Sequence, residues 1–343
     1  MRSLLLKQTI ASTRGEPMRI VVIGMGSMGR RRARLLLGMG GHEVVGVDLD
    51  ADRRAQAQEE LQIPTYASLE DAALAVDLEA AVISTGPLTH AGIVSDCLDN
   101  HLHVFTELNL VDDGYEENAA KAEEQGLVWF PSSTFVYRRE VEEIQKMISA
   151  KGTVGAWTYH VGQYLPDWHP WEDYKNFFVA NERTSGVREL LAVELPWLVK
   201  IFGPIAEAYP VSEKISDLDV SYNDACAIAI KHESGAIGML MIDVVCRTAV
   251  RDFTFTNEEC YLTWDGTPTG LKSLDIDTHE MVSVDVYGNK SAEQLSDYAR
   301  FIVEDAYRSE LEAFLETAQG HSAMRWSLDE DAEVISLINE IEG

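Results

Sequence analysis

The sequence of 343 residues has little cysteine, and this shortage excludes several classes of protein. Its four cysteines are widely spaced, without a Cys-x-x-Cys pair or a histidine cluster at zinc-binding spacing. No metal site is therefore predicted. We expect reduced, mostly buried thiols in a cytoplasmic protein. The cysteines are Cys97, Cys226, Cys246 and Cys260.

Basic residues and long apolar runs are also scarce. There are 28 Lys and Arg residues against 57 Asp and Glu, which gives a formal net charge of -29. Nucleic acid and anionic membrane surfaces would repel this charge, so neither is an expected partner. The only apolar run near the start is Leu4 to Leu6, and Lys7 ends it before it could form a signal peptide or a membrane span. Residues 1–17 are expected to form a loose extension.

Residues 18–135 show the alternation of an α/β domain. Short runs of β-branched residues, such as Arg19 to Ile23 and His42 to Asp48, alternate with helical segments such as Arg30 to Met39. This alternation predicts right-handed crossovers and a doubly wound parallel sheet that is covered on both faces. We therefore expect an N-terminal domain over residues 18–135.

The pattern changes after about Val136. A long helix at Gly186 to Phe202 is followed by several strand candidates in series, including Ala225 to Lys231 and Ala236 to Val245. Short turns such as Glu233 to Gly235 join these strands, which indicates antiparallel pairing. Residues 136–343 are therefore expected to form an α+β domain with a mostly antiparallel open sheet.

The clearest motif is a glycine turn between the first strand and the first helix. It reads Gly24-Met25-Gly26-Ser27-Met28-Gly29, which lets the backbone approach a pyrophosphate at the N-terminus of a helix. Asp48 ends the second strand, 19 residues beyond Gly29, where a carboxylate can bind the adenine ribose hydroxyls. Together they predict a Rossmann domain for a dinucleotide.

Asp48 also bears on which dinucleotide is bound. Its carboxylate would repel a 2′-phosphate, and the adjacent Leu49 offers no positive charge to offset that repulsion. The predicted cofactor is therefore NAD rather than NADP.

With these residues in view, the chain resembles the Gfo/Idh/MocA family of NAD(P)-dependent oxidoreductases over nearly all of residues 18–342. Ser84 to His90 looks like the stretch that the family places near the nicotinamide, and Val104 to Glu107 looks like the strand end that carries the family's Glu-Lys-Pro motif. Glu310 to Phe314 resembles the family's C-terminal Glu-Leu-x-x-Phe. The resemblance implies that Thr85, Gly86, His90 and Glu107 lie near the cofactor.

A narrower resemblance concerns the substrate. The segment Gly162 to Trp168, with Pro170-Trp171 and Asp173-Tyr174, is similar to members of the family from surface-polysaccharide gene sets. Gly186 to Gly203 resembles the helix that carries the family's substrate-site residues. A sugar-like substrate is implied. Its expected contacts are Asp167, Trp168, Tyr174, Arg188 and Glu189.

The sequence departs from the family pattern where proton transfer is expected. Leu108 replaces the lysine of Glu-Lys-Pro, and on the substrate helix Val193 and Pro196 stand where the family has His and Asp. Leucine can neither donate nor accept a proton. If hydride transfer persists, the proton must pass through another group, and we name His169 and Tyr164 as the catalytic candidates.

These residues predict an NAD-dependent oxidoreductase that transfers a hydride to or from a hydroxyl or keto carbon of a sugar derivative. Two alternatives stay open: a degenerate NAD-binding regulatory or assembly protein, and a redox-neutral glycosidase that uses held NAD. The apolar strand from Ala236 to Val245, in a sheet with one face left uncovered, predicts a homodimer or homotetramer.

Overall fold

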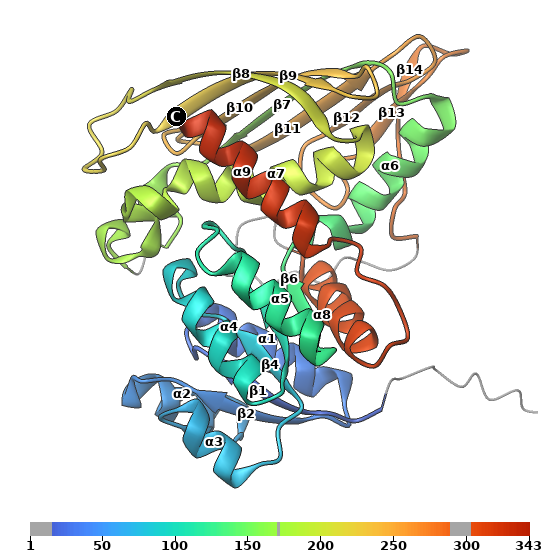
Figure 1. Ribbon diagram of the computed structural model, residues 1–343. Coiled ribbons are helices and arrows are strands. Elements are labelled where there is room, and N and C mark those ends of the chain that lie inside the picture. The colour runs from blue at the N-terminus through green and yellow to red at the C-terminus, as the bar shows by residue number, and fades with distance from the viewer. Residues whose placement is uncertain (1–15, 170–171, 289–302) are drawn as a thin grey trace, which may run out of the picture.

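The computed structural model describes residues 16–169, 172–288 and 303–343. Its first part is a six-stranded parallel sheet of order β3-β2-β1-β4-β5-β6, flanked by helices (Figure 1). The strands are β1 (Arg19–Ile23), β2 (Glu43–Val47), β3 (Thr65–Tyr66), β4 (Ala80–Ile83), β5 (His103–Thr106) and β6 (Trp129–Pro131). The helices are α1 (Ser27–Met39), α2 (Ala51–Leu61), α3 (Leu69–Ala75), α4 (His90–Asp99) and α5 (Tyr115–Gln125).

The central strands of this sheet are apolar on both faces. Val21 and Val22 of β1 are both fully buried, one in each of two separate clusters of apolar side chains. This is typical of a parallel sheet with helices on both sides. Strand order reverses between β1 and β4, so their carboxyl ends open the crevice where such folds bind ligands.

The second part is an eight-stranded sheet of order β14-β13-β12-β11-β7-β10-β9-β8. Only β7 and β10 pair in parallel, and the other neighbours are antiparallel. The predicted α+β fold is confirmed. The strands are β7 (Ala156–Gly162), β8 (Ile205–Glu213), β9 (Ala225–His232), β10 (Ile237–Asp243), β11 (Val250–Thr256), β12 (Tyr261–Trp264), β13 (Lys272–Asp275) and β14 (Glu280–Ser283).

Helices α6 (Arg139–Lys151), α7 (Gly186–Phe202) and α9 (Leu328–Glu342) lie on one side of the large sheet (Figure 1). Alternate strand residues such as Trp157 and Tyr159 are buried beneath these helices, whereas Met239 faces the other way and is half exposed. The buried layer is rich in aromatic rings, among them the edge-to-face pair of Tyr159 and Trp197. This layer fixes the position of α7.

Helix α8 (Glu304–Ala318) returns to the first domain and packs on α1. Arg32 of α1 is fully buried and pairs with Glu310 of α8 at 2.7 Å. Glu310 also accepts hydrogen bonds from the Ser132 hydroxyl at 2.9 Å and the Ser133 amide at 2.6 Å. The residues that resemble the family's C-terminal motif thus fasten α8 to α1 and to the end of β6.

Several elements differ from the sequence-based prediction. Strand β3, helix α3 and the edge strand β8 were not predicted, and the helix expected from Glu293 begins at Glu304 within the described residues. The part of that prediction before Val303 lies outside the described residues. The capping box of Ser327 and Glu330 that opens α9 is confirmed.

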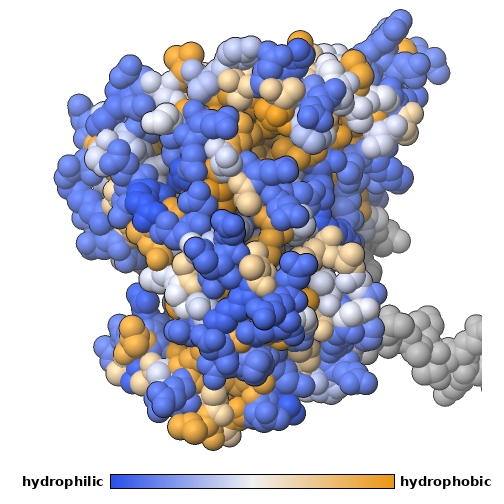
Figure 2. All heavy atoms as spheres, in the orientation of Figure 1, coloured by the Kyte–Doolittle hydropathy of each residue, from blue (hydrophilic) through white to orange (hydrophobic). Residues whose placement is uncertain are grey.

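Hydrophilic residues cover most of the face shown in Figure 2, as the net charge of -29 leads one to expect. Among the described residues, none of the helices combines the length and the apolarity that crossing a membrane requires.

Candidate functional site

The glycine turn is shaped so that only glycine fits at two of its positions. Gly24 has a φ of 92°, and a Cβ there would lie 2.6 Å from the Ser84 carbonyl oxygen. A Cβ on Gly29 would lie 1.7 Å from the Gly24 carbonyl oxygen. Both glycines therefore bring the turn close to β4 and to α1.

Met25 is buried, but other parts of the turn face open space. A Cβ on Gly26, or on Gly86 at the end of β4, would meet no atom within 4 Å. Ser27, the first residue of α1, is exposed, and Met28 is half-buried. The turn thus leaves a gap before the N-terminus of α1, where a pyrophosphate fits the backbone N–H groups and the helix dipole. The predicted residues Gly24, Gly26, Ser27, Met28 and Gly29 form one cradle.

Asp48 is held rigidly beside this cradle. Its Oδ2 accepts from the Met25 amide at 2.7 Å, and its Oδ1 accepts from the Asp50 amide at 2.8 Å. A carboxylate has further lone pairs, so both oxygens can still accept hydrogen bonds from ribose hydroxyls. The residues of this region fit a dinucleotide.

A positive charge near Asp48 was missed by the sequence argument. Leu49 is 91% exposed and carries no charge, but Arg54 of α2 donates from Nη1 to the Asp48 carbonyl at 2.7 Å and to the Leu49 carbonyl at 3.0 Å. The helical turn folds this side chain back over the strand end. Its position could be inferred only from a helix that begins at Ala51.

The segments expected near the nicotinamide form a connected polar cluster. His90 lies 3.2 Å from the Thr85 carbonyl and 2.9 Å from Asn109 Oδ1, and Asn109 in turn donates to the Tyr115 hydroxyl at 2.8 Å. Burial lowers the pKa of His90, so its imidazole is neutral at pH 7. This arrangement suits a packed residue at the start of α4 that shapes the site.

Glu107 lies at the end of β5 and is 15% exposed. Its side chain pairs with the buried Arg32 at 2.5 Å, and its amide donates to the Ile83 carbonyl at 2.9 Å. Glu107 and Glu310 thus share one guanidinium. The carboxylate is fixed at the strand end, where the sequence analysis expected it.

Helix α7 is tied to the chain beyond β5 by Arg188. This buried residue donates from Nε to the Leu110 carbonyl, and its other nitrogens bond to Asn339 and Glu342 of α9. These described contacts give Arg188 a clear role in positioning α7. Its predicted contact with substrate stays a prediction.

Glu189 follows Arg188 directly on α7, and one of its two carboxyl oxygens has no hydrogen-bond partner among the described residues. Its Oε2 is buried and accepts no hydrogen bond among the described residues. Burial raises the pKa of Glu189 to about 8, and the nearby Arg251 opposes that shift. A group of this kind is protonated at neutral pH and can ionise just above it.

Arg251 and Tyr222 complete the surroundings of Glu189, and the sequence analysis did not single out either residue. Arg251 of β11 is paired with the fully buried Glu194 at 2.8 Å, while the Tyr222 hydroxyl accepts from the Gly186 amide at 3.2 Å. Burial raises the pKa of Tyr222 to about 12, and the charges of Glu189 and Tyr174 add to the shift. Two predicted substrate residues, Glu189 and Tyr174, thus both lie within electrostatic range of Tyr222.

The other predicted residues lie in the segment that follows β7. The Tyr164 ring is covered by the Arg247 guanidinium at 3.6 Å, and the Trp168 indole donates to the Gln163 carbonyl at 3.0 Å. His169 packs edge-to-face on Phe177 at 4.3 Å, and burial lowers its pKa.

Two more predicted residues complete this segment. Asp167 is exposed, and the Tyr174 hydroxyl accepts from the Asp219 amide at 3.1 Å. The described contacts place Tyr164 and His169 in one segment but show no hydrogen bond between them, so their catalytic role stays a prediction.

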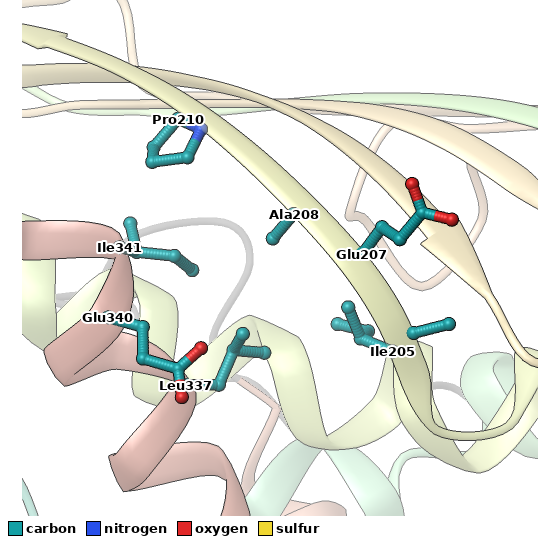
Figure 3. Close-up of a pocket in the computed structure, with 8 residues that line it drawn as sticks. Ile205, Glu207, Ala208, Pro210, Leu337, Glu340 and Ile341 are labelled. Carbon is teal, nitrogen blue, oxygen red and sulfur yellow. The ribbon is translucent and has the colours of Figure 1, made fainter.

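A small recess lies elsewhere, between β8 and α9 (Figure 3). Its volume of about 90 Å³ is far below the several hundred Å³ of a site for a drug-sized ligand. Glu207, on its rim, is engaged by Lys231 at 2.7 Å. The recess is therefore no candidate for the cofactor or the substrate.

Comparison with known proteins agrees with this geometry. Residues 18–130 match the model of GFO_IDH_MocA, described as an oxidoreductase family with an NAD-binding Rossmann fold. Residues 18–130 are therefore similar to the NAD-binding domain of the Gfo/Idh/MocA oxidoreductases. None of the curated proteins matches the sequence.

Solved structures extend the likeness in fold beyond the Gfo/Idh/MocA domain. UDP-N-acetylglucosamine 3-dehydrogenase GnnA from Acidithiobacillus ferrooxidans is 18% identical, with 94% of this chain and 96% of that chain covered and a TM-score of 0.74. Myo-inositol 2-dehydrogenase from Lactobacillus plantarum is 15% identical, with 95% and 96% covered and a TM-score of 0.75. GenD2 from gentamicin A biosynthesis, in complex with NAD, is 20% identical, with 96% and 94% covered and a TM-score of 0.73.

Proposed function

We propose that the chain is an NAD-dependent oxidoreductase that transfers a hydride to or from a hydroxyl or keto carbon of a sugar derivative, in surface-polysaccharide metabolism. The observation that carries this proposal is the buried carboxyl group of Glu189, held on the helix that Arg188 fastens beside the cofactor half of the molecule. The names of GnnA, a UDP-sugar dehydrogenase, and of myo-inositol 2-dehydrogenase support the class of substrate.

In this proposal the bound nicotinamide supplies the hydride donor or acceptor, and the protein supplies binding and the proton. Gly26 and the N-terminus of α1 receive the pyrophosphate, and Asp48 receives the adenine ribose. Glu189, protonated up to pH about 8, donates a proton to a substrate carbonyl oxygen, or accepts one from a hydroxyl when ionised. Arg251 stabilises the ionised form.

Glu189 joins Tyr164 and His169 as a proton-transfer candidate because Leu108 offers no ionisable group. Leu108 is half-buried at the end of β5 and packs against the apolar core. The exchange of family lysine for leucine is read from the sequence resemblance. Without that lysine, the proton must be transferred by a side chain of the second domain, where Glu189, Tyr164 and His169 lie.

The test is the balance of cofactor during turnover. Purified protein is incubated with NAD and a panel of UDP-sugars and inositols, and NADH is followed by absorbance while the sugar is followed by mass spectrometry. Net NADH formation with an oxidised sugar supports the proposal. A changed sugar without net NADH identifies a redox-neutral enzyme and contradicts it. Glu189→Gln should lose activity, and Glu333→Gln, an exposed change on α9, should keep it.

A second candidate is an NAD-binding protein without turnover. It is favoured by the apolar Leu108, Val193 and Pro196, which stand where the resemblance expects polar groups. Calorimetric binding of NAD, together with no conversion of any sugar in the panel, would establish this candidate in place of the enzyme.

We also propose that the chain self-associates through the outer face of its large sheet. Ile237 and Met239 of β10 are 54% and 53% exposed there, and Tyr209 of β8, which lies two strands away, is 62% exposed. Burying such a patch favours a second copy. Met239→Asp should yield a monomer in light scattering, whereas Leu74→Asp, at an exposed leucine of α3, should leave the oligomer intact.

A further inference from the structure

Three potential metal ligands converge at the carboxyl end of β7. His160 of β7 lies with its Nε2 2.7 Å from Oδ2 of Asp243, the last residue of β10. Cys246 follows in the next loop, and the ligand atoms of all three residues lie within 4.8 Å of one another. No spacing in the sequence announces this cluster, because His160 is 83 residues away from Asp243.

The Asp243 carboxylate is oriented in advance. Its Oδ1 accepts from the amides of Val245 at 3.0 Å and Cys246 at 2.7 Å, which directs Oδ2 toward His160. A ligand carboxylate fixed by backbone donors is the usual second layer of a metal site. The turn after β10 therefore sets the position of two of the three ligands.

Gly162 provides the space for this cluster. A Cβ at Gly162 would lie 2.6 Å from Asp243 Oδ2 and 2.9 Å from the Cys246 Cβ. Any larger residue would push both ligands away from His160. The glycine thus forms a cradle under the carboxylate and the cysteine, which is a second observation independent of the ligand distances.

We propose that His160, Asp243 and Cys246 bind a zinc ion. Imidazole nitrogen, thiolate sulfur and carboxylate oxygen are the zinc ligands of proteins, and three of them leave a fourth position for water. Asp252, the cross-strand neighbour of His160 on β11, is exposed beside this position.

Binding requires two small adjustments. The Cys246 thiol, which now donates to the Thr248 carbonyl at 3.1 Å, releases its proton to solvent and binds as thiolate. Zinc bonds of about 2.0–2.3 Å spread tetrahedral ligands to more than 3 Å apart, so the His160 ring must move outward by roughly 1 Å. Its side chain is 40% exposed and is free to do so.

The ion would join the bases of two loops. Gln163 donates to the Asp243 carbonyl at 3.3 Å, Leu165 donates to the Val244 carbonyl at 2.9 Å, and Arg247 covers the Tyr164 ring. Zinc at this place stabilises the start of the segment that carries Tyr164, Trp168 and His169. This inference goes beyond the proposed hydride transfer and does not depend on it, because His160, Asp243 and Cys246 are neither the proposed cofactor residues nor the proton-transfer candidates.

Cobalt(II) replaces zinc as a spectroscopic probe. The full chain, reduced and stripped of metal by chelation, is titrated with Co²⁺, and zinc is then added to displace it. We expect one equivalent to bind, with a near-ultraviolet thiolate-to-cobalt band and intense visible bands of tetrahedral cobalt. Cys246→Ser should abolish the near-ultraviolet band, and His160→Gln should weaken binding at least about tenfold.

The matched control is Cys260→Ser, which changes a buried cysteine directly before β12. This variant should leave the spectrum unchanged. Circular dichroism confirms that each variant is folded. The proposal is overturned if the wild-type chain shows only the spectrum of aqueous cobalt, or if the thiolate band survives in folded Cys246→Ser. In either case His160 and Asp243 form a hydrogen-bonded pair that fixes the turn without metal.

Discussion

Arg188 on α7 donates a hydrogen bond to the backbone carbonyl of Leu110, beyond the end of β5. The bond joins the helix of the second domain to the segment that contains Leu108 and Asn109. Because Glu189 follows Arg188 directly, its carboxyl group is carried by a turn of helix that cannot drift from this segment. Further bonds from Arg188 to α9 make the same turn rigid.

The first prediction concerns the choice of cofactor. NAD should bind at least about tenfold more tightly than NADP, or about 1.4 kcal/mol, because Asp48 repels the 2′-phosphate. Arg54 attracts that phosphate, so Arg54→Ala should widen the preference by weakening NADP alone. Calorimetric titration with both cofactors measures the affinities. Arg53→Ala, at the exposed neighbour, serves as the control. Equal affinity of the wild-type protein for both cofactors would refute the assignment of Asp48 to the ribose.

The second prediction is a pH dependence set by Glu189, whose pKa burial raises to about 8. Sugar oxidation needs the ionised base, so its rate should rise with pH through about 8, and carbonyl reduction should fall over the same range. Glu189→Gln should remove this transition and lower turnover about a hundredfold, while NAD affinity stays unchanged. Initial rates from pH 6 to about 10 test it. A profile that is the same in wild type and variant would contradict the role.

Glu189 also links pH to stability. The folded state keeps the proton up to pH about 8, whereas the unfolded chain loses it near the ordinary value of 4.5. The folded state therefore binds more protons between these values, and stability from this group falls as pH rises through that window. The free energy of unfolding is measured with urea at pH 5 and pH 8 for the wild type and for Glu189→Gln. Relative to the wild type, the variant should be more stable by at least about 1 kcal/mol at pH 8 than it is at pH 5. If the difference in stability between variant and wild type is the same at both pH values, the carboxyl group is not buried.

The fourth prediction concerns the Arg32 and Glu310 pair between α1 and α8. Glu310→Gln leaves a fully buried guanidinium with less negative charge, so the free energy of unfolding should fall by about 3–5 kcal/mol. Glu316→Gln, an exposed change on the same helix, should have little effect. Urea denaturation of both variants measures the difference. If Glu310→Gln and Glu316→Gln unfold at the same urea concentration, Glu107 alone balances the charge of the buried Arg32.

Much of the first domain could be predicted from local patterns. The glycine turn, the alternation of strands and helices, and Asp48 at a strand end depend on residues near one another in the sequence. Strand β8 escaped prediction because Glu207 and Pro210 interrupt its apolar pattern. The structure places it at the edge of the sheet, where proline is tolerated.

The rest depends on contacts between distant residues. Glu189 could be named from the resemblance, but its raised pKa arises from burial near Arg251, which is 62 residues further along the sequence. Tertiary packing of this kind leaves no periodic signal in the sequence.

The last prediction separates the three proton-transfer candidates. Leu108 provides no acid or base, so turnover must depend on Glu189, Tyr164 or His169. Burial lowers the pKa of His169, which makes it a neutral base at pH 7. If the segment after β7 carries the chemistry, Tyr164→Phe or His169→Ala should lower turnover about a hundredfold with NAD affinity nearly unchanged. Leu108→Lys should restore little, because its ammonium group would lose solvation in the cleft and Val193 and Pro196 remain. Single-turnover kinetics of these three variants and of Glu189→Gln decide the matter, with Glu333→Gln as the control. Robust turnover in both Tyr164→Phe and His169→Ala would exclude those two residues and leave Glu189 as the proton-transferring group.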